Sequence, residues 1–347
     1  MWLTPAPRAL FICSGGKNRV RVHIHTNHPE QVFAKLTPFG TISSQKIDDM
    51  WQQHSEKFSG KMVGKIGIVT DSSCDLPFDF IEENHINIIP VKIVFGNKAY
   101  LDKVDLSPVE FYNKLTKAAI HPKTSQPAMA DIKKTYDRVA PFYEKIISIH
   151  LPRAVSGTLQ SIERAAELFG DNKITSVDSK TISGALGLVV MEAAAAVKQE
   201  LPFNRVIEKI QYAIENIHIY VSLPTLKYLV KGGRISASKG VIGKILNLNP
   251  IITFDEEGKV KLADKAIGQK SARQKTFNLI SQKAKPYKRY KFIVAHANAP
   301  EKARWYLNQL KNHFKITEEI PVVDAAPALG VHTGPGTAGI AFIGYYD

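Results

Sequence analysis

The sequence predicts an α/β protein of two domains, with a largely parallel sheet in the first domain and a mixed or antiparallel sheet in the second. Short apolar strands alternate with helices from about residue 65 to residue 222, which is typical of a parallel layer. Residues 251–254 and 259–262 then flank the turn 255–258, which is hairpin chemistry. A chain of 347 residues is also long enough for two or three domains.

The elements of the first domain, residues 65–224, follow from local patterns. Ser107 precedes Pro108 and Glu110, so a helix capped by Ser107 is predicted there. Apolar runs and alanine-rich segments predict the other elements. They are strands at 65–70, 86–95, 146–149, 174–177 and 218–222, and helices at 157–169 and 183–198.

The second domain, residues 225–347, contains the predicted hairpin. Helices are expected at 269–284 and 300–313, and strands at 292–296, 315–323 and 340–345. Because a hairpin joins neighbouring antiparallel strands, this sheet should be mixed or antiparallel. The domain boundary is predicted between residues 222 and 231.

Residues 1–64 form a separate N-terminal segment. A strand at 20–25, a short helix opened by Pro29 and ended by Gly40, and a strand at 42–47 are expected, followed by a linker at 57–64. This piece is too small to hold a hydrophobic core alone.

Charge and cysteine content narrow the class of protein. The formal net charge is +14, which favours acidic partners, but the Lys and Arg residues form no uninterrupted block, so solvated faces are favoured over a nucleic-acid footprint. Two cysteines, Cys13 and Cys74, do not suggest a disulfide framework. No apolar run reaches membrane-spanning length. A cytoplasmic protein is predicted, with transient contact at a membrane surface left open.

Three segments rich in small hydroxyl residues lie at 70–73, 124–127 and 156–158. Segments that follow strands at the carboxyl edge of a sheet are where α/β proteins bind ligands. Ser156 lies just before a helix, where its hydroxyl and free backbone N–H groups can hold an anion. Taken singly, Ser156 and Ser107 are better explained as helix caps.

Two glycine-rich segments in the second half carry polar side chains. A short helix from residue 223 ends at Gly232 and Gly233 and is followed by Arg234, whose guanidinium can bind a carboxylate or phosphate. Residues 330–339 hold four glycines around His332, which predicts a loop that approaches a ligand closely.

Together these segments resemble the DegV family. The matching stretches, in the family's order, are 66–77, 124–127, 156–158, 177–180, 231–235 and 332–336, and the resemblance covers about residue 65 to residue 347. It implies a two-domain α/β fold that holds a fatty acid between the domains. It also implies a fatty-acid-binding subunit of a bacterial fatty acid kinase, with the bound fatty acid as its ligand and no other cofactor.

The resemblance assigns roles to named residues. Thr124 and Ser156 should bond the fatty-acid carboxylate. Arg234 and His332 match residues near the phosphoryl acceptor and are the expected catalytic residues. Ser125, Gly157 and Thr158 complete the expected carboxylate-binding set. His332 is expected in this set as well as in the catalytic one. The acyl tail needs an apolar tunnel, which periodicity does not locate.

Residues 18–56 have a resemblance of their own, to the dihydroxyacetone-kinase-like ATP-binding subunit of the same kinase system. His28 and Pro29 stand where that family has Asp-Pro. His23 and His25 match two zinc ligands of that subunit, but two histidines hold zinc poorly, so no metal site is predicted. The nucleotide-binding domain of that subunit is expected upstream and is absent from this sequence, so a separate ATP-binding subunit is the expected partner.

Two other functions fit parts of the sequence. One is an autonomous phosphotransfer or acyl-transfer enzyme that uses His332 and Arg234. It is disfavoured because no G-x-x-x-x-G-K-[ST] loop occurs. The other is a nucleic-acid-binding regulator, which the net charge alone suggests and no recognisable motif supports.

Overall fold

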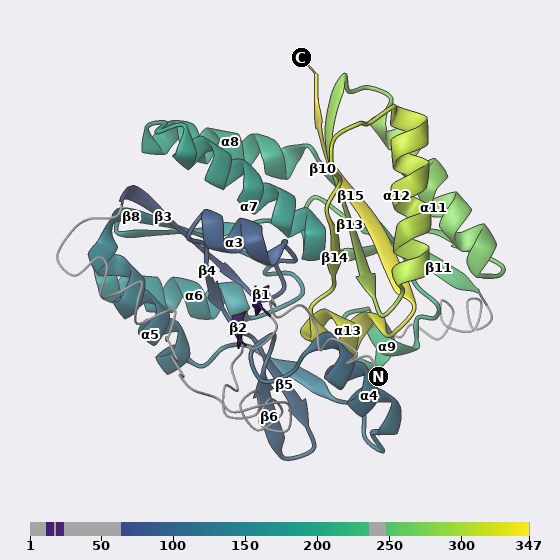
Figure 1. Ribbon diagram of the computed structural model, residues 1–347, viewed down its shortest axis with the longest axis horizontal. Coiled ribbons are helices and arrows are strands. Elements are labelled where there is room, and N and C mark those ends of the chain that lie inside the picture. The colour runs from purple at the N-terminus through teal and green to yellow at the C-terminus, as the bar shows by residue number, and fades with distance from the viewer. Residues whose placement is uncertain (1–11, 17–18, 24–63, 236–247, 347) are drawn as a thin grey trace. The chain divides into compact units, whose positions relative to one another are not determined.

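The computed structural model describes residues 12–16, 19–23, 64–235 and 248–346 (Figure 1). The chain divides into two compact units, Met1–Lys61 and Met62–Asp347. In the first unit, β1 (Ile12–Gly16) and β2 (Arg19–His23) pair in antiparallel register. The predicted helix 29–40, the strand 42–47 and the linker up to residue 63 lie outside the described residues.

A four-stranded parallel sheet forms the first half of the second unit, as predicted. Its order is β4-β3-β8-β9, and every pair is parallel. The strands are β3 (Gly64–Asp71), β4 (Asn87–Ile89), β8 (Tyr143–His150) and β9 (Ile174–Asp178). Ile146 and Ile147 of β8 are both fully buried and belong to different apolar clusters. Both faces of this sheet are therefore covered.

Helices cover the two faces of the parallel sheet. In Figure 1, α5 and α6 lie on one side of it and α7 on the other. The helices of this half are α3 (Phe78–Glu83), α4 (Pro108–Lys117), α5 (Met129–Val139), α6 (Thr158–Ala166), α7 (Ser183–Lys198) and α8 (Phe203–Glu215). The capping box predicted at Ser107 is present, and the predicted bounds of α7 are confirmed. The sequence patterns did not identify α3, α5 and α8.

The strand predicted at 86–95 is two strands in different sheets. Pro90, which has no backbone N–H to donate, separates β4 from β5 (Lys92–Phe95). The strand β5 pairs with β6 (Lys98–Leu101) and β7 (Lys123–Ser125) in an antiparallel sheet ordered β6-β5-β7. Thr124 and Ser125, expected in a loop, therefore stand on a short strand.

A mixed six-stranded sheet forms the second half, in the order β12-β11-β10-β15-β13-β14. Among the described strands of this sheet, only β13 and β14 pair in parallel. The strands are β10 (Ile217–Ser222), β11 (Asn249–Phe254), β12 (Val260–Ala266), β13 (Arg289–Ala297), β14 (Val322–Asp324) and β15 (Thr337–Tyr345). The strand predicted at 315–323 is confined to β14. Although β10 precedes the predicted boundary at residue 224, it pairs with β11 and β15 and belongs to this sheet.

Helices of the second half are α9 (Lys227–Lys231), α11 (Gln269–Ala284), α12 (Pro300–Phe314) and α13 (Pro327–Thr333). The bounds of α11 agree with the prediction, and α12 extends one residue further. In Figure 1, α11 and α12 lie side by side next to the mixed sheet.

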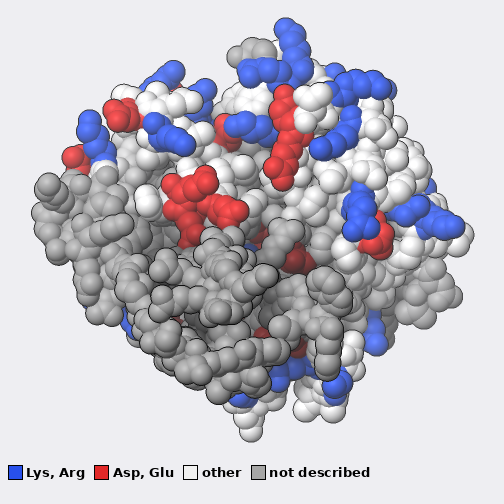
Figure 2. Space-filling view, in the orientation of Figure 1, with Lys and Arg blue, Asp and Glu red and all other residues white. Residues whose placement is uncertain are grey.

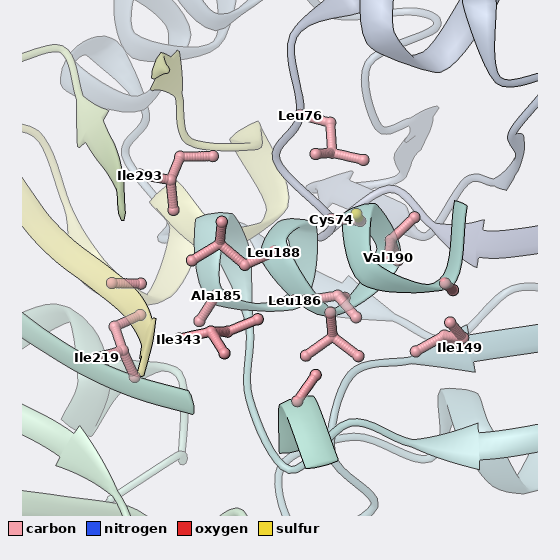
Figure 3. Packing of buried hydrophobic residues seen from close by; sticks show 14 of the residues in the cluster. Cys74, Leu76, Ile149, Ala185, Leu186, Leu188, Val190, Ile219, Ile293 and Ile343 are labelled. Carbon is pink, nitrogen blue, oxygen red and sulfur yellow. The ribbon is translucent and has the colours of Figure 1, made fainter. Parts of the chain in front are cut away.

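The helix α7 joins the two halves through one apolar core. Most of its side chains are buried around its whole circumference, as expected for a helix packed on both sides. Figure 3 shows its residues between Ile149 of the parallel sheet and Ile219, Ile293 and Ile343 of the mixed sheet. This shared core therefore packs α7 against central strands of both sheets.

The surface carries mixed charge. On the face shown in Figure 2, Lys and Arg side chains are interspersed with Asp and Glu and form no continuous basic patch among the described residues. None of the described helices is long and apolar enough to cross a membrane.

Candidate functional site

A cavity of about 370 Å³ lies where segments from the two halves meet. The first half contributes segments at 124–126 and 151–158, and the second contributes α9, the β11–β12 hairpin and α13. All seven residues that the sequence singled out line this cavity. They are Thr124, Ser125, Ser156, Gly157, Thr158, Arg234 and His332.

One wall of the cavity is built from hydroxyl groups at the start of α6. The Ser156 Oγ lies 2.9 Å from Thr158 Oγ1 and accepts a hydrogen bond from the Thr158 backbone N–H at 3.2 Å. The N-cap residue of α6 is Gly157, which has no side chain to cap the helix, so Ser156 stands one residue before the cap position and lines the cavity. The structure therefore does not make Ser156 the cap of this helix. Free N–H groups in a first helical turn favour an anion.

Gly157 allows a close contact at this wall. A Cβ atom placed on Gly157 would lie 2.2 Å from Oε1 of Gln126. The Gln126 amide therefore packs directly on the backbone at the start of α6, next to Ser125 on the end of β7. Ser125, Gln126 and Gly157 are all exposed, so this polar edge forms the mouth of the cavity.

A second wall of the cavity carries His332, which lies in the last turn of α13. The sequence predicted a glycine-rich loop here; instead Pro327 opens a helix, and the loop begins only at Gly334. The His332 Nε2 lies 2.8 Å from Thr124 Oγ1, and Nδ1 is buried with no partner among the described residues. Burial, reinforced by Arg234 and His121, lowers the pKa of His332 to about 3, so the imidazole is neutral at physiological pH.

Arg234 follows the predicted turn at the end of α9. Its Nη1 donates to the Gly232 carbonyl at 2.5 Å, and its Nε donates to the Val155 carbonyl at 3.2 Å. Burial lowers the pKa of Arg234, but an arginine stays charged at physiological pH. Because both bonds go to backbone carbonyls, the guanidinium keeps its positive charge without a carboxylate partner in these contacts.

Position 232 needs a glycine because the His332 ring lies close to it, and not because of its own backbone angles. A Cβ atom at Gly232 would lie only 2.0 Å from the His332 Nδ1. The glycine therefore lets the Nδ1 edge of the imidazole ring approach the turn that presents Arg234. The sequence motif predicted a tight turn, and the structure adds this close approach.

The interior of the cavity is apolar. Its hydrocarbon lining is Val91, Leu151, Val155, Ile182, Leu229, Ile252, Phe254, Val260, Ala328 and Leu329. Ile252 and Leu229 are almost fully buried, in contrast to the exposed residues of the mouth. Among the described lining residues Arg234 carries the sole charge. The cavity therefore suits an anionic head at its mouth and a hydrocarbon tail inside.

Sequence reasoning missed several lining residues. Ser73 and Gln126 belong to the hydroxyl-rich segments 70–73 and 124–127, so the sequence could have predicted that they line the cavity. Thr333 follows His332 directly. The apolar lining gave no usable pattern, because its members come from strands, helices and loops far apart in the chain.

The described residues contain no group of three or more His, Cys, Asp or Glu side chains arranged to hold a metal ion. Of the two histidines matched to zinc ligands, His23 ends β2 and His25 lies outside the described residues.

Comparison with known proteins agrees with this architecture. Residues 65–344 match the DegV family profile. The chain belongs to the DegV family. A DegV domain-containing protein of Clostridium acetobutylicum is 33% identical over 280 residues, which cover 80% of this chain and 98% of the relative. A DegV domain-containing protein of Staphylococcus aureus is 33% identical over 279 residues, which also cover 80% of this chain and 98% of the relative.

Solved DegV structures share the fold. A fatty-acid-binding DegV protein of Thermus thermophilus superposes with a TM-score of 0.76 at 28% identity, covering 81% of this chain and 99% of the other. DegV of Bacillus subtilis, described as a fatty-acid-binding protein, superposes with a TM-score of 0.73 at 27% identity and the same coverage. The predicted two-domain DegV-like fold is confirmed.

The front of this DegV chain matches a second family. Residues 9–57 match the middle domain of FakA-like fatty acid kinase proteins. The resemblance found at residues 18–56 is thus confirmed, over a slightly longer stretch.

Proposed function

We propose that this DegV protein binds one long-chain fatty acid in the cavity and presents its carboxylate to a separate ATP-dependent kinase. The product would be an acyl phosphate that feeds phospholipid synthesis, and the setting would be the cytoplasm. The observation that supports this most is the polarity of the cavity. Hydroxyl groups, Arg234 and His332 surround its polar part, and buried or half-buried hydrocarbon side chains line the rest.

Burial of the acyl chain supplies the affinity in this proposal. Each methylene removed from water contributes about 0.8 kcal/mol, so a long tail binds tightly with few polar contacts. A carboxylate in such a site is costly unless hydrogen bonds compensate it. Thr124 and Ser156 are the proposed donors, with Ser125, Gly157 and Thr158 beside them.

The neutral His332 fits this arrangement. If Nε2 carries the ring proton, it donates to Thr124 Oγ1, and the Thr124 hydroxyl hydrogen is then free to bond the ligand carboxylate. This assignment leaves the unpartnered Nδ1 without a hydrogen, beside the Gly232 backbone. The Thr124 hydroxyl can donate to the resting carboxylate without His332, and the Nε2–H group of His332 would turn from Thr124 to an oxygen of the phosphoryl group when that group arrives.

Phosphoryl transfer then needs the partner. A carboxylate oxygen attacks the γ-phosphorus of ATP held by the kinase, the bond from phosphorus to the ADP oxygen breaks, and an acyl phosphate and ADP form. Negative charge on the transferring group is greatest in this step, so Arg234 and His332 are placed to stabilise it. The sequence has no phosphate-binding loop of its own.

Two measurements test the proposal. Mass spectrometry of lipid extracted from the denatured protein should find about one long-chain fatty acid for each chain; a protein that stays free of lipid after exposure to stearic acid contradicts it. Incubation with ATP alone should yield no acyl phosphate, whereas adding the ATP-binding subunit of a bacterial fatty acid kinase should. Acyl phosphate formed by the chain alone would instead support an autonomous enzyme.

A further inference from the structure

Residues 71–75, at the end of β3 and in the turn after it, bind the segments that carry the two walls of the cavity through two buried carboxylates. Asp71 stands at the start of this segment and Asp75 at its end, and neither side chain has exposed surface. A buried carboxylate is costly unless its oxygens accept hydrogen bonds, so the groups that donate to it are held firmly. The donors of Asp71 and Asp75 lie in the two segments that carry the candidate site.

Asp71 holds the segment that leads to Ser156. Its Oδ2 accepts a hydrogen bond from the Leu151 backbone N–H at 3.0 Å and lies 3.0 Å from the His150 Nδ1. Its Oδ1 accepts from the Ser73 hydroxyl at 2.5 Å and from the Ser73 backbone N–H at 3.0 Å. Leu151 is the first residue after β8, and the chain runs from it to the hydroxyl wall at Ser156.

Asp75 holds the helix that carries His332. Its Oδ1 accepts from the Ala326 backbone N–H at 3.0 Å and from Lys103 Nζ at 2.8 Å, and its Oδ2 accepts from the Ser183 hydroxyl at 2.6 Å. Ala326 is the N-cap residue of α13. Because α13 has seven residues and a helix rises about 1.5 Å per residue, its two ends are roughly 10 Å apart. Fixing the start of so short a helix fixes the position of His332 near its end.

The same turn reaches α13 a second time. The Ser72 hydroxyl donates to Asp102 Oδ2 at 2.7 Å, and Asp102 Oδ1 accepts from the Ala328 backbone N–H at 3.1 Å. Asp102 is also fully buried. Two carboxylates from the first half therefore bind N–H groups at the start of a helix that belongs to the second half.

We propose that Asp71 and Asp75 are positioning residues, with Asp71 setting the Ser156 wall and Asp75 setting His332 against Thr124. Neither carboxylate lines the cavity, so each acts through the backbone it holds. The inference rests on the proposed function. It predicts separable defects, because Ser156 serves the resting carboxylate whereas His332 serves the charge that develops during phosphoryl transfer.

Three substitutions and one control test this positioning in the full chain. Asp75→Ala removes the acceptor for Ala326. Asp75→Asn keeps an acceptor oxygen for Ala326, and its amide can donate to the Ser183 hydroxyl. Asp71→Ala removes the acceptor for Leu151. The control is Asp105→Ala, which deletes an exposed carboxylate that accepts from the Leu101 N–H and makes no bond to α13.

Each variant is titrated with stearic acid and then assayed with ATP and the ATP-binding subunit. Asp75→Ala should bind stearic acid as wild type does but turn over on the order of a hundredfold more slowly, the cost of misplacing a reacting group by about 1 Å. Asp75→Asn should restore most of that turnover. Asp71→Ala should raise the Kd for stearic acid. If the alanine variant does not fold, Asp71→Asn is measured in its place. Both oxygens of Asp71 face donors, so the amide NH2 group would lose the hydrogen bonds on one side and should also raise the Kd. Asp105→Ala should match wild type.

Three results would overturn the positioning roles. Unchanged turnover in Asp75→Ala is the first. Equal losses in Asp75→Ala and Asp75→Asn are the second, since they would show that charge matters and the Ala326 bond does not. A parallel loss of binding, turnover and melting temperature in the Asp71 and Asp75 variants is the third, since it would show a purely structural role. If the wild-type protein itself neither binds stearic acid nor supports turnover, the proposed function is wrong. That result is distinct from a failure of the positioning roles, which appears only in the variants.

Discussion

Thr124 and His332 lie 2.8 Å apart, measured from Oγ1 to Nε2, although 208 positions separate them in the sequence. Thr124 stands on β7, a strand of the small antiparallel sheet, and His332 stands on α13 near the mixed sheet. The contact therefore closes the candidate site across the two halves of the DegV fold. Both residues line the cavity, so a ligand head placed there meets both at once.

We expect the double substitution Thr124→Ala and Ser156→Ala to weaken fatty-acid retention. Each lost hydrogen bond to a charged carboxylate is worth about 1.5–3 kcal/mol, so the two together should raise the Kd by at least a hundredfold. Lipid that co-purifies with the protein, quantified by mass spectrometry, provides the measurement. Ser107→Ala is the matched control, because it removes a helix-capping hydroxyl that does not line the cavity. Undiminished lipid in the double variant would remove these hydroxyls from the site.

Arg234→Ala and His332→Ala should keep most of the bound fatty acid but lose acyl-phosphate formation with the partner kinase and ATP. The physical reason is that their interactions strengthen only when phosphoryl charge arrives, which changes rate more than substrate binding. Bound lipid, melting temperature and turnover should be measured on the same samples. Loss of lipid and stability together would mean that the residues only shape the walls, and full turnover in both variants would exclude them from the mechanism.

Gly232→Ala should impair turnover through His332. The added methyl group would meet the His332 Nδ1 at 2.0 Å, so the imidazole must move away from Thr124. Gly233→Ala is the informative control. Its backbone φ of 70° disfavours alanine by about 1 kcal/mol, but no atom lies near the added methyl group. We expect both variants to lose stability and only Gly232→Ala to lose most of its turnover. Equal turnover in the two would contradict the packing argument.

The free energy of unfolding should fall as the pH falls below about 6.5, in part because of His332. Its pKa is about 3 in the folded protein, against about 6.5 in the unfolded chain, so the unfolded chain binds more protons between these values. The stability contributed by the neutral ring is thus complete above pH 6.5 and is lost toward pH 3. Each such group contributes a slope of about 1.4 kcal/mol per pH unit.

Urea unfolding at several pH values between 5 and 7.5 measures this slope. His332→Gln should unfold with a shallower dependence on pH than wild type. His218→Gln is a useful comparison, because burial lowers the pKa of His218 to about 4 and it lies outside the cavity lining. Both substitutions should flatten the curve, but only His332→Gln should also affect turnover. A steeper curve for His332→Gln would contradict the assignment.

Local sequence patterns determined much of this fold. Ser107 with Glu110 specified the capping box of α4, and continuous apolar composition specified α7 from Ser183 to Lys198, because both depend on neighbours within one or two turns. The order of short motifs along the chain also identified the DegV family and seven of the residues that line the cavity.

Other features of the fold follow from contacts between distant parts of the chain, which local patterns do not contain. Pro90 divides two strands that join different sheets, and β10 pairs with strands that follow the predicted boundary. His332 lies on a helix whose N–H groups are bonded by Asp75 and Asp102, more than 200 positions earlier in the chain. Strand partners, long-range helix caps and a cavity wall assembled from many segments are contacts between distant residues. Their free energy depends on chain packing that no short window of sequence records.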